Sequence, residues 1–244
     1  MNQKTYDCYV KILKTELVPA LGCTEPIALA YASAKAVDVL GDFPDRMEAL
    51  CSGNIIKNVK GVKVPNSGGL KGVEAAVILG AAGGDASKEL EVLESVQEKD
   101  RERTAALLKD RFCTCLLKEG VPNLYIEIHA FKGAETAVVR IEQTHTNITF
   151  ISRNGAVLFE KEAVSQEALT DKSLLNLNDI ITFAEEVDLD LVKDCLERQI
   201  EYNMAISEEG LKHNGGRGVR RTILETLGHD VRTKPIAGAA AGSD

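Results

Sequence analysis

Apolar residues recur every three to four positions near the start of the chain, a spacing that is typical of an amphipathic helix. The positions that follow it, before Pro19 ends the run, are Tyr6, Val10, Leu13 and Leu17. A second helical pattern covers residues 26–40 and is rich in alanine. Alanine favours helix, and its small side chain lets neighbouring helices approach closely. We therefore expect this second helix to lie inside the protein.

Residues 51–72 have a different character, because asparagine, serine and glycine are mixed with valine and isoleucine. Two interpretations are open. The segment could offer amides and backbone N–H groups to a small carboxylate or phosphate, or it could consist of turns between short strands. The residues alone favour the turns. A run of small residues over 72–82, closed by Gly83 and Gly84, predicts a further helix.

The spacing of apolar residues changes further along the chain. Residues 87–119 carry an apolar stripe opposite glutamate and lysine, which predicts one long helix with a solvated face. Over 121–160 apolar and polar residues alternate, and Lys132-Gly133 and Asn154-Gly155 mark turns. We therefore expect an antiparallel sheet of four strands there. Helical patterns return after Lys161.

Together these patterns predict an α+β fold. A mostly helical part, rich in alanine and glycine, would comprise residues 1–84 and 163–244. Residues 85–162, one helix plus the four-stranded antiparallel sheet, would be inserted into it. The apolar run Ala237–Gly242 near the last residue suggests that the helical part is incomplete at its C-terminal end.

Candidate chemistry is concentrated where the first two helices meet, at Leu21-Gly22-Cys23-Thr24-Glu25-Pro26. Pro26 suits the first turn of a helix, and Thr24 or Glu25 would cap it. Cys23 would then precede a helix N-terminus, where backbone N–H groups and the helix dipole favour a thiolate. A thiolate suits a metal, an iron–sulfur cluster or a nucleophilic step. The alternative is a buried loop cysteine that behaves as a small hydrophobe.

Composition narrows the function classes. The net charge is −8 and only 5% of the residues are aromatic, which argues against nucleic acid as a partner. No apolar run approaches the length of a membrane span, and we expect a cytoplasmic protein. The six cysteines are too sparse and irregular for a disulfide framework. Cys113 and Cys115 lie in the predicted long helix, where positions two apart point to different faces.

Several segments resemble one enzyme family. The hexapeptide 21–26 resembles the LGCTEP signature of the L-cysteine desulfidase / L-serine dehydratase alpha-chain-like family (UPF0597-type). The resemblance continues, in the family's order, through residues 52–58, 64–69, 144–148 and 238–244. Members of that family are much longer and carry further cysteines in a second half. The chain therefore resembles the amino-terminal half of such an enzyme, or a truncated product.

The resemblance implies α,β-elimination of L-cysteine or L-serine to pyruvate and ammonia, with an oxygen-sensitive [4Fe-4S] cluster as cofactor. It implies that Cys23 is a cluster ligand or an active-site thiol, with Thr24 and Glu25 as the other catalytic positions. His145 is a candidate from its position at a strand junction, whereas His129, which shares a strand face with Glu127, is expected to be solvated. The candidates for substrate binding are Asn54, Asn58, Asn66, Ser67, Gly68, His145 and Asn147.

Because one cysteine cannot hold a four-iron cluster, we expect the isolated chain to lack a complete cluster and to be inactive. A homo-oligomer or a complementary C-terminal half would be its protein partner, and a small amino acid its substrate. The alternative is an amino-acid-binding or regulatory subunit without its own activity. A downstream reading frame with further cysteines would favour a split enzyme, and a purely structural helical protein would leave the polar segment 51–72 without a purpose.

Overall fold

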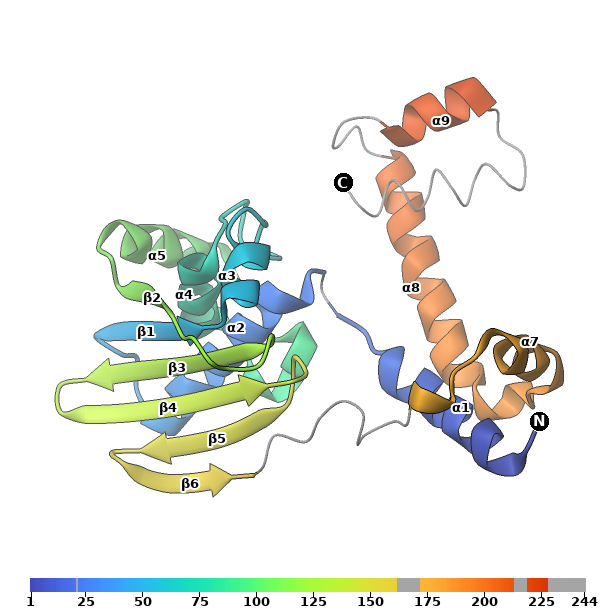
Figure 1. Cartoon of the computed structure of the whole chain (residues 1–244). Helices are drawn as coiled ribbons and strands as arrows, with labels where there is room; N and C mark the ends of the chain where they lie inside the picture. Colours follow the sequence, from blue (N-terminus) through green and yellow to red (C-terminus); the bar gives the residue numbers. More distant parts are fainter. Residues whose placement is uncertain (21, 162–171, 213–218, 228–244) are drawn as a thin grey trace. The chain divides into compact units, whose positions relative to one another are not determined.

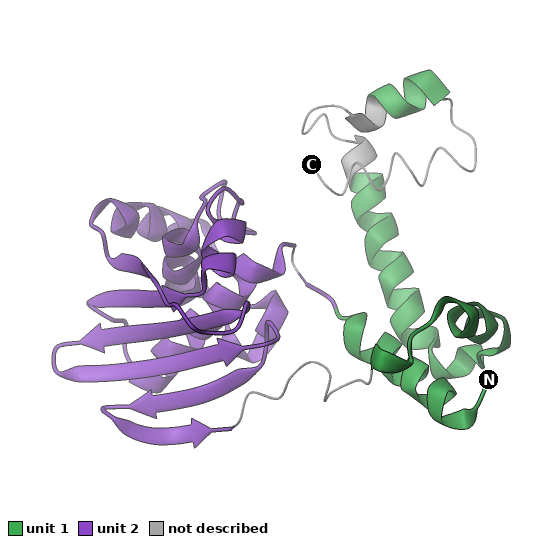
Figure 2. Ribbon diagram, in the orientation of Figure 1, with its two compact units in different colours: residues 1–18, 170–244 green, residues 19–169 purple. Residues whose placement is uncertain are grey.

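The computed structural model describes residues 1–20, 22–161, 172–212 and 219–227 (Figure 1). The chain divides into two compact units, of which one comprises residues 1–18 and 170–244 and the other residues 19–169 (Figure 2). The domain boundaries expected from the sequence, after residues 84 and 162, divide the chain differently from these units. The C-terminal motif at 238–244 lies outside the described residues.

The larger unit contains a six-stranded mixed sheet in the order β2-β1-β3-β4-β5-β6. Its strands are β1 (Arg46–Cys51), β2 (Cys113–Leu117), β3 (Tyr125–Lys132), β4 (Glu135–Glu142), β5 (Ile148–Arg153) and β6 (Ala156–Glu160). Only β1 and β2 are parallel, and every other neighbouring pair is antiparallel. The α+β class and the antiparallel run from β3 to β6 are therefore confirmed, and two strands are added to the four that were predicted.

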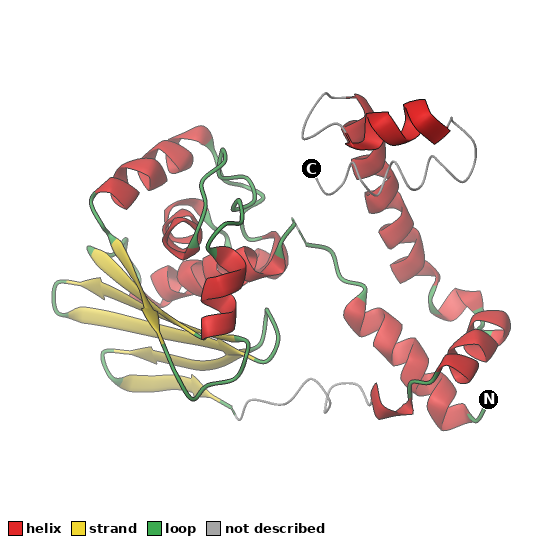
Figure 3. Cartoon of the chain, turned by 45° about the horizontal axis from the view of Figure 1, so that its top comes forward, coloured by secondary structure: helices red, strands yellow, loops and turns green. Residues whose placement is uncertain are grey.

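Four helices accompany the sheet and lie on one side of it (Figure 3). They are α2 (Thr24–Leu40), α3 (Gly53–Val59), α4 (Val73–Gly83) and α5 (Glu98–Lys109), and a short 3-10 helix, η1 (Ala86–Glu91), precedes α5. The alanine-rich helix is internal, as predicted, because nearly every residue from Pro26 to Ala36 is buried. The small-residue run over 72–82 forms α4, also as predicted.

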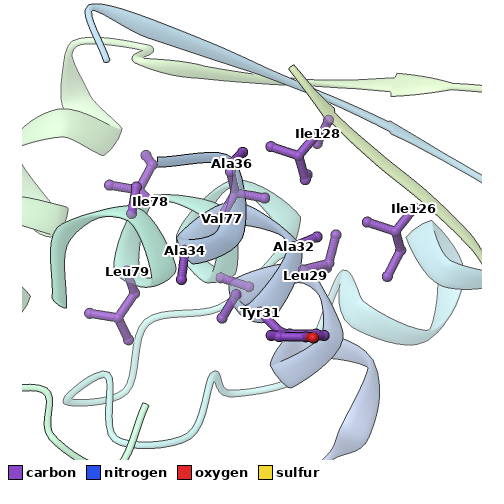
Figure 4. Packing of buried hydrophobic residues seen from close by; sticks show 14 of the residues in the cluster. Leu29, Tyr31, Ala32, Ala34, Ala36, Val77, Ile78, Leu79, Ile126 and Ile128 are labelled. Carbon is purple, nitrogen blue, oxygen red and sulfur yellow. The ribbon is translucent and has the colours of Figure 1, made fainter. Parts of the chain in front are cut away.

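The core lies between the sheet and the two central helices. Ile126 and Ile128 of β3 point toward α2, whose other side packs on α4 (Figure 4). Small side chains at the crossing bring the two helices close enough for the buried Ser33 hydroxyl to donate a hydrogen bond to the Val77 carbonyl oxygen at 2.6 Å. The N-terminal end of α2 is therefore held in a fixed place relative to the sheet.

The prediction of one long helix over residues 87–119 is wrong, because the segment forms η1, α5 and β2. The chain leaves α5 through Arg111, which adopts a left-handed φ of 55°. Cys113 and Cys115 consequently lie in a strand, where positions two apart share a face, and both pair with β1. The prediction that they point to different faces is corrected accordingly.

The smaller unit is helical. Its elements are α1 (Gln3–Glu16), the 3-10 turns η2 (Lys172–Leu174) and η3 (Leu189–Leu191), α7 (Leu177–Glu186), α8 (Lys193–Lys212) and α9 (Val219–Leu227). Phe183 of α7 packs edge-on against Tyr6 and Tyr9 of α1, with ring centroids 5.5 Å apart in each pair. None of the helices in the described ranges is long and apolar enough to cross a membrane.

Candidate functional site

The candidate site begins at the N-terminal end of α2. Cys23 is the N-cap residue of the helix, so the predicted capping by Thr24 or Glu25 is corrected by one or two positions. The exposed Cys23 thiol donates a hydrogen bond to Glu25 Oε2 at 3.1 Å. Thr24 is half-buried in the first turn between them. The thiol and the carboxylate that were adjacent in sequence thus form one hydrogen-bonded pair.

Helix α3 brings an amide to the same carboxylate. Asn58 Nδ2 donates to Glu25 Oε1 at 3.3 Å, so the two carboxylate oxygens have different partners. Ser52 positions this helix, because its hydroxyl accepts a hydrogen bond from the Ile55 N–H at 3.3 Å and donates to the Asn123 carbonyl oxygen at 2.6 Å. Ser52 was not among the predicted site residues, although a serine directly before a helical pattern is a common N-cap signal.

The turn between β4 and β5 brings an imidazole near Glu25. His145 lies in this turn and is half-buried, and in its protonated form its charge interacts with that of the Glu25 carboxylate. Asn147 closes the turn, because its side-chain amide donates to the Glu142 carbonyl oxygen at 2.8 Å. Asn147 therefore holds in place the turn that carries His145. Its own side-chain amide is hydrogen-bonded to the backbone.

Burial and proximity set the protonation states of the three ionisable groups. Desolvation, followed by the neighbouring Glu25 carboxylate, raises the pKa of the Cys23 thiol. Desolvation also raises the pKa of Glu25, but the hydrogen bond from Cys23, a backbone N–H, the charge of His145 in its protonated form and the hydrogen bond from Asn58 outweigh it, and the net pKa is lowered. Burial lowers the pKa of His145. Near neutral pH the site therefore holds a thiol, a carboxylate and a neutral imidazole.

The sequence predicted that the helix dipole would favour a thiolate at Cys23. The raised pKa corrects this prediction to a protonated thiol. The N-terminal end of α2 does supply backbone N–H groups there, and one of them stabilises negative charge on the sulfur. Burial and the carboxylate two residues away act in the opposite direction and are stronger. The first turn of the helix therefore carries its negative charge on Glu25.

Asn66, Ser67 and Gly68, which were also predicted to bind substrate, shape a loop instead. Asn66 adopts a left-handed φ of 55°, and its amide donates to the Leu93 carbonyl oxygen at 2.8 Å. Ser67 is buried, and its hydroxyl donates to the Leu70 carbonyl oxygen at 3.2 Å. Both residues shape a tight loop, in which Gly68 has a φ of 72°. Asn54 is exposed, one turn before Asn58, and makes no side-chain hydrogen bond to other described residues.

This loop nevertheless borders the site. A Cβ atom on Gly22, the residue before Cys23, would lie 3.4 Å from the Pro65 ring. Arg101 of α5, which sequence reasoning missed, fixes the loop from behind through a hydrogen bond from its Nε to the Asn66 carbonyl oxygen at 2.8 Å. The polar segment 51–72 thus contributes one direct side chain, Asn58, and a rigid wall beside Cys23.

A four-iron cluster does not fit the described residues. Such a cluster is bound by about four cysteine thiolates, and the site supplies only Cys23. Cys51, Cys113 and Cys115 lie on the sheet strands β1 and β2 and have buried or half-buried side chains. No group of three or more histidine, cysteine, aspartate or glutamate side chains in the described ranges is arranged to hold a metal ion.

The pairing of Cys23 with Glu25 makes a testable prediction about thiol reactivity. In Glu25→Gln the negative charge beside the sulfur is lost, so the pKa of Cys23 falls and the thiolate fraction at neutral pH rises. We expect iodoacetamide to alkylate Cys23 roughly threefold to tenfold faster at pH 7.5. The rate is measured by mass spectrometry of the Cys23 peptide. The exposed Glu119→Gln serves as the matched control and should leave the rate unchanged; slower alkylation in Glu25→Gln would contradict the electrostatic coupling.

Comparisons with known proteins give one consistent set of relatives. The chain is 48% identical over 240 residues to a UPF0597 protein of Lachnoclostridium phytofermentans, which covers 98% of the chain and 58% of that relative. It is 45% identical over 238 residues to a UPF0597 protein of Finegoldia magna, with 97% and 57% covered. No protein-family model matches the chain, and no solved structure matches it.

These relatives correct the family assignment made from the sequence motifs. They are named UPF0597 proteins rather than L-cysteine desulfidases or L-serine dehydratase alpha chains, so the chain is not identified as a truncated dehydratase alpha chain. The chain spans a little more than half the length of the relatives it matches. Over nearly its whole length, therefore, the chain is a relative of the UPF0597 proteins.

Proposed function

We propose that the chain carries part of the active site of a cytoplasmic lyase that removes the β-substituent of a small α-amino acid, L-cysteine or L-serine. The observation that carries the proposal is the convergence of Cys23, Glu25, Asn58 and His145, which come from three separate segments of the chain. A carboxylate and a protonated thiol form a hydrogen-bonded pair at the N-terminal end of α2, and His145 lies close enough to influence the pKa of the carboxylate. These are the groups that binding and proton transfer to an amino acid require.

Each group has a role in the elimination. The Glu25 carboxylate pairs with the substrate ammonium and is held in place by Asn58. The neutral imidazole of His145 accepts the α-proton, and the Cys23 thiol donates a proton to the departing thiolate or hydroxide. The electrons of the broken C–H bond form the Cα–Cβ double bond of 2-aminoacrylate, whose imine form reacts with water to give pyruvate and ammonium. Return of the proton from His145 to Cys23 restores the site.

The site supplies one possible cluster ligand, Cys23, so this sequence of steps uses no cluster. Cys23 would hold a cluster only together with cysteines from outside the part of the relatives that matches this chain. A chain without those ligands would bind the amino acid and turn it over slowly or not at all. The alternative function, an amino-acid-binding subunit without activity, uses the same Glu25 and Asn58 contacts.

The test is anaerobic pyruvate release, with L-cysteine and L-serine offered separately. The chain is compared with the same chain extended by the remaining portion of the Lachnoclostridium phytofermentans relative. In the active form, we expect His145→Gln to lower kcat by about 100-fold, since it removes the proton acceptor. Glu25→Gln should raise KM at least about tenfold, since it removes the charge that pairs with the ammonium.

His129→Gln is the matched control, because His129 belongs to a separate cluster on the sheet and contacts Glu127. Its kcat should equal that of the unmodified protein. Binding of L-serine by calorimetry without pyruvate from either form would overturn the lyase and favour the binding subunit. Neither binding nor pyruvate would overturn both.

A further inference from the structure

An exposed apolar surface runs along α8. Val192, just before the helix, and Cys195 are 1% and 7% exposed. Seven and eleven residues after Cys195, on the same side of the helix, Tyr202 and Ile206 are 46% and 55% exposed. The face that is buried at the base of α8 therefore continues along the helix into solvent. Apolar side chains at such spacing ordinarily face another part of a protein.

Two further apolar residues, on the other side of the helix, are also exposed. Ile200 and Met204 are one turn apart and are 61% and 53% exposed. At its base the surface joins a groove of about 360 Å³, whose apolar lining includes Leu17, Val18 and Leu191 as well as Cys195. Charged groups of both signs, Lys14, Arg198, Asp190 and Asp194, complete the lining. The groove and the face of α8 that carries Cys195, Tyr202 and Ile206 are continuous through Cys195 and are called the α8 surface below.

The relatives indicate what covers this surface. The chain matches almost end to end, yet it spans only 57–58% of the length of each relative, so more than two fifths of such a protein has no counterpart here. An apolar stripe along a helix, next to a groove, suits an amphipathic helix laid against it. We propose that the α8 surface is the docking site for an amphipathic helix from that remaining portion of the UPF0597 chain. This proposal is independent of the proposed function.

The proposal requires the α8 surface to be open in this chain and covered in the intact relative. Tyr202→Cys and Ile206→Cys are labelled with a maleimide in this chain, and the residues that align with them are replaced by cysteine in the intact Lachnoclostridium phytofermentans protein. We expect labelling to be at least tenfold slower in the intact relative. Glu197→Cys, which is exposed on the opposite side of α8, is the matched control and should react equally fast in both proteins.

A second measurement separates this occupant from a second copy of the chain. Sedimentation of the unmodified chain should give a monomer at micromolar concentration. A dimer that Ile206→Glu dissociates would overturn the proposal and assign the α8 surface to self-association. Equal labelling of positions 202 and 206 in the two proteins would overturn it as well, because the remaining portion would then lie elsewhere. Peptide-level mass spectrometry distinguishes the introduced cysteines from the native ones, including the exposed Cys23.

Discussion

Replacing Gly80 with alanine is expected to destabilise the larger unit by about 3 kcal/mol. Gly80 lies where α4 crosses α2, and a Cβ atom added there would stand 2.3 Å from the Ala30 carbonyl oxygen and 2.6 Å from the Ala30 Cα. Both are backbone atoms of a buried helix, so no side chain can rotate away. Alanine would otherwise gain about 1 kcal/mol as the better helix former, but overlap with the backbone forces the helices apart and opens their packing.

The measurement is chemical or thermal unfolding of the whole chain. A loss of that size lowers Tm by roughly 6–12 °C for a unit of about 150 residues. Gly61→Ala is the matched control, since its added Cβ would meet nothing within 4 Å, and it should leave Tm unchanged or slightly higher. An unchanged Tm for Gly80→Ala would contradict the close approach of α2 and α4 at this position.

The same two helices illustrate what the sequence predicts well. Alanine and glycine at 26–40 and 72–84 leave few ways to bury a helix except against another helix, so both elements and their burial followed from composition. The strands from β3 to β6 also followed, because alternation and Asn-Gly or Lys-Gly turns coincide there. In each case the local preference and the tertiary structure agree.

In β1 and β2, the two strands that were not predicted, the local preference and the tertiary structure do not agree. In β1, Met47, Ala49 and Cys51 face the core, and these residues favour strands weakly on their own. The chain passes from α5 to β2 without glycine or proline, since Arg111 takes the left-handed conformation that glycine usually provides. The sequence therefore carries no stop signal after α5. The pairing with β1, a contact distant in sequence, is what makes residues 113–117 a strand.

The candidate site was predicted in part for a related reason. Residue type identified Cys23, Glu25 and His145, but nothing local places the turn at His145 beside α2, 120 positions earlier in the sequence. Asn58 and Asn66 look alike in sequence, because both belong to the polar segment 51–72. Only the folded chain separates them, because Asn58 reaches Glu25 whereas Asn66 binds backbone carbonyl oxygens. A sequence pattern gives the chemistry of a side chain and leaves its partner undetermined.

A second large effect is expected at Glu127, which is only 5% exposed on β3. Its carboxylate accepts hydrogen bonds from the Tyr125 hydroxyl at 2.7 Å and from Arg140 Nε at 2.8 Å, and it contacts His129 Nε2 at 2.9 Å. Desolvation raises the pKa of Glu127, but these three partners, His129 foremost, outweigh it and lower the pKa from 4.5 to about 2. Each tenfold change in ionisation is about 1.4 kcal/mol, so the ionised form contributes roughly 3 kcal/mol to stability.

The lowered pKa of Glu127 decides in which pH range its carboxylate stabilises the fold. The contribution is complete above the pKa of Glu127 in the unfolded chain, and it is lost as the pH falls from about 5 toward 2. Glu127→Gln should therefore lower the free energy of unfolding by about 3 kcal/mol at pH 7 and flatten its decline between pH 5 and 2. Urea unfolding at several pH values measures both.

The matched control is Glu135→Gln, on the neighbouring strand β4. Glu135 also accepts hydrogen bonds from a cation and an amide, Arg153 at 3.4 Å and Asn154 at 2.7 Å, but it is exposed to solvent. Water screens such a pair, so Glu135→Gln should leave the free energy of unfolding nearly unchanged. Equal losses at positions 127 and 135 would mean that burial adds nothing to the Glu127 network. A larger loss at 127, with a flattened pH dependence, would establish that the buried carboxylate stabilises β3 and β4 as an ion.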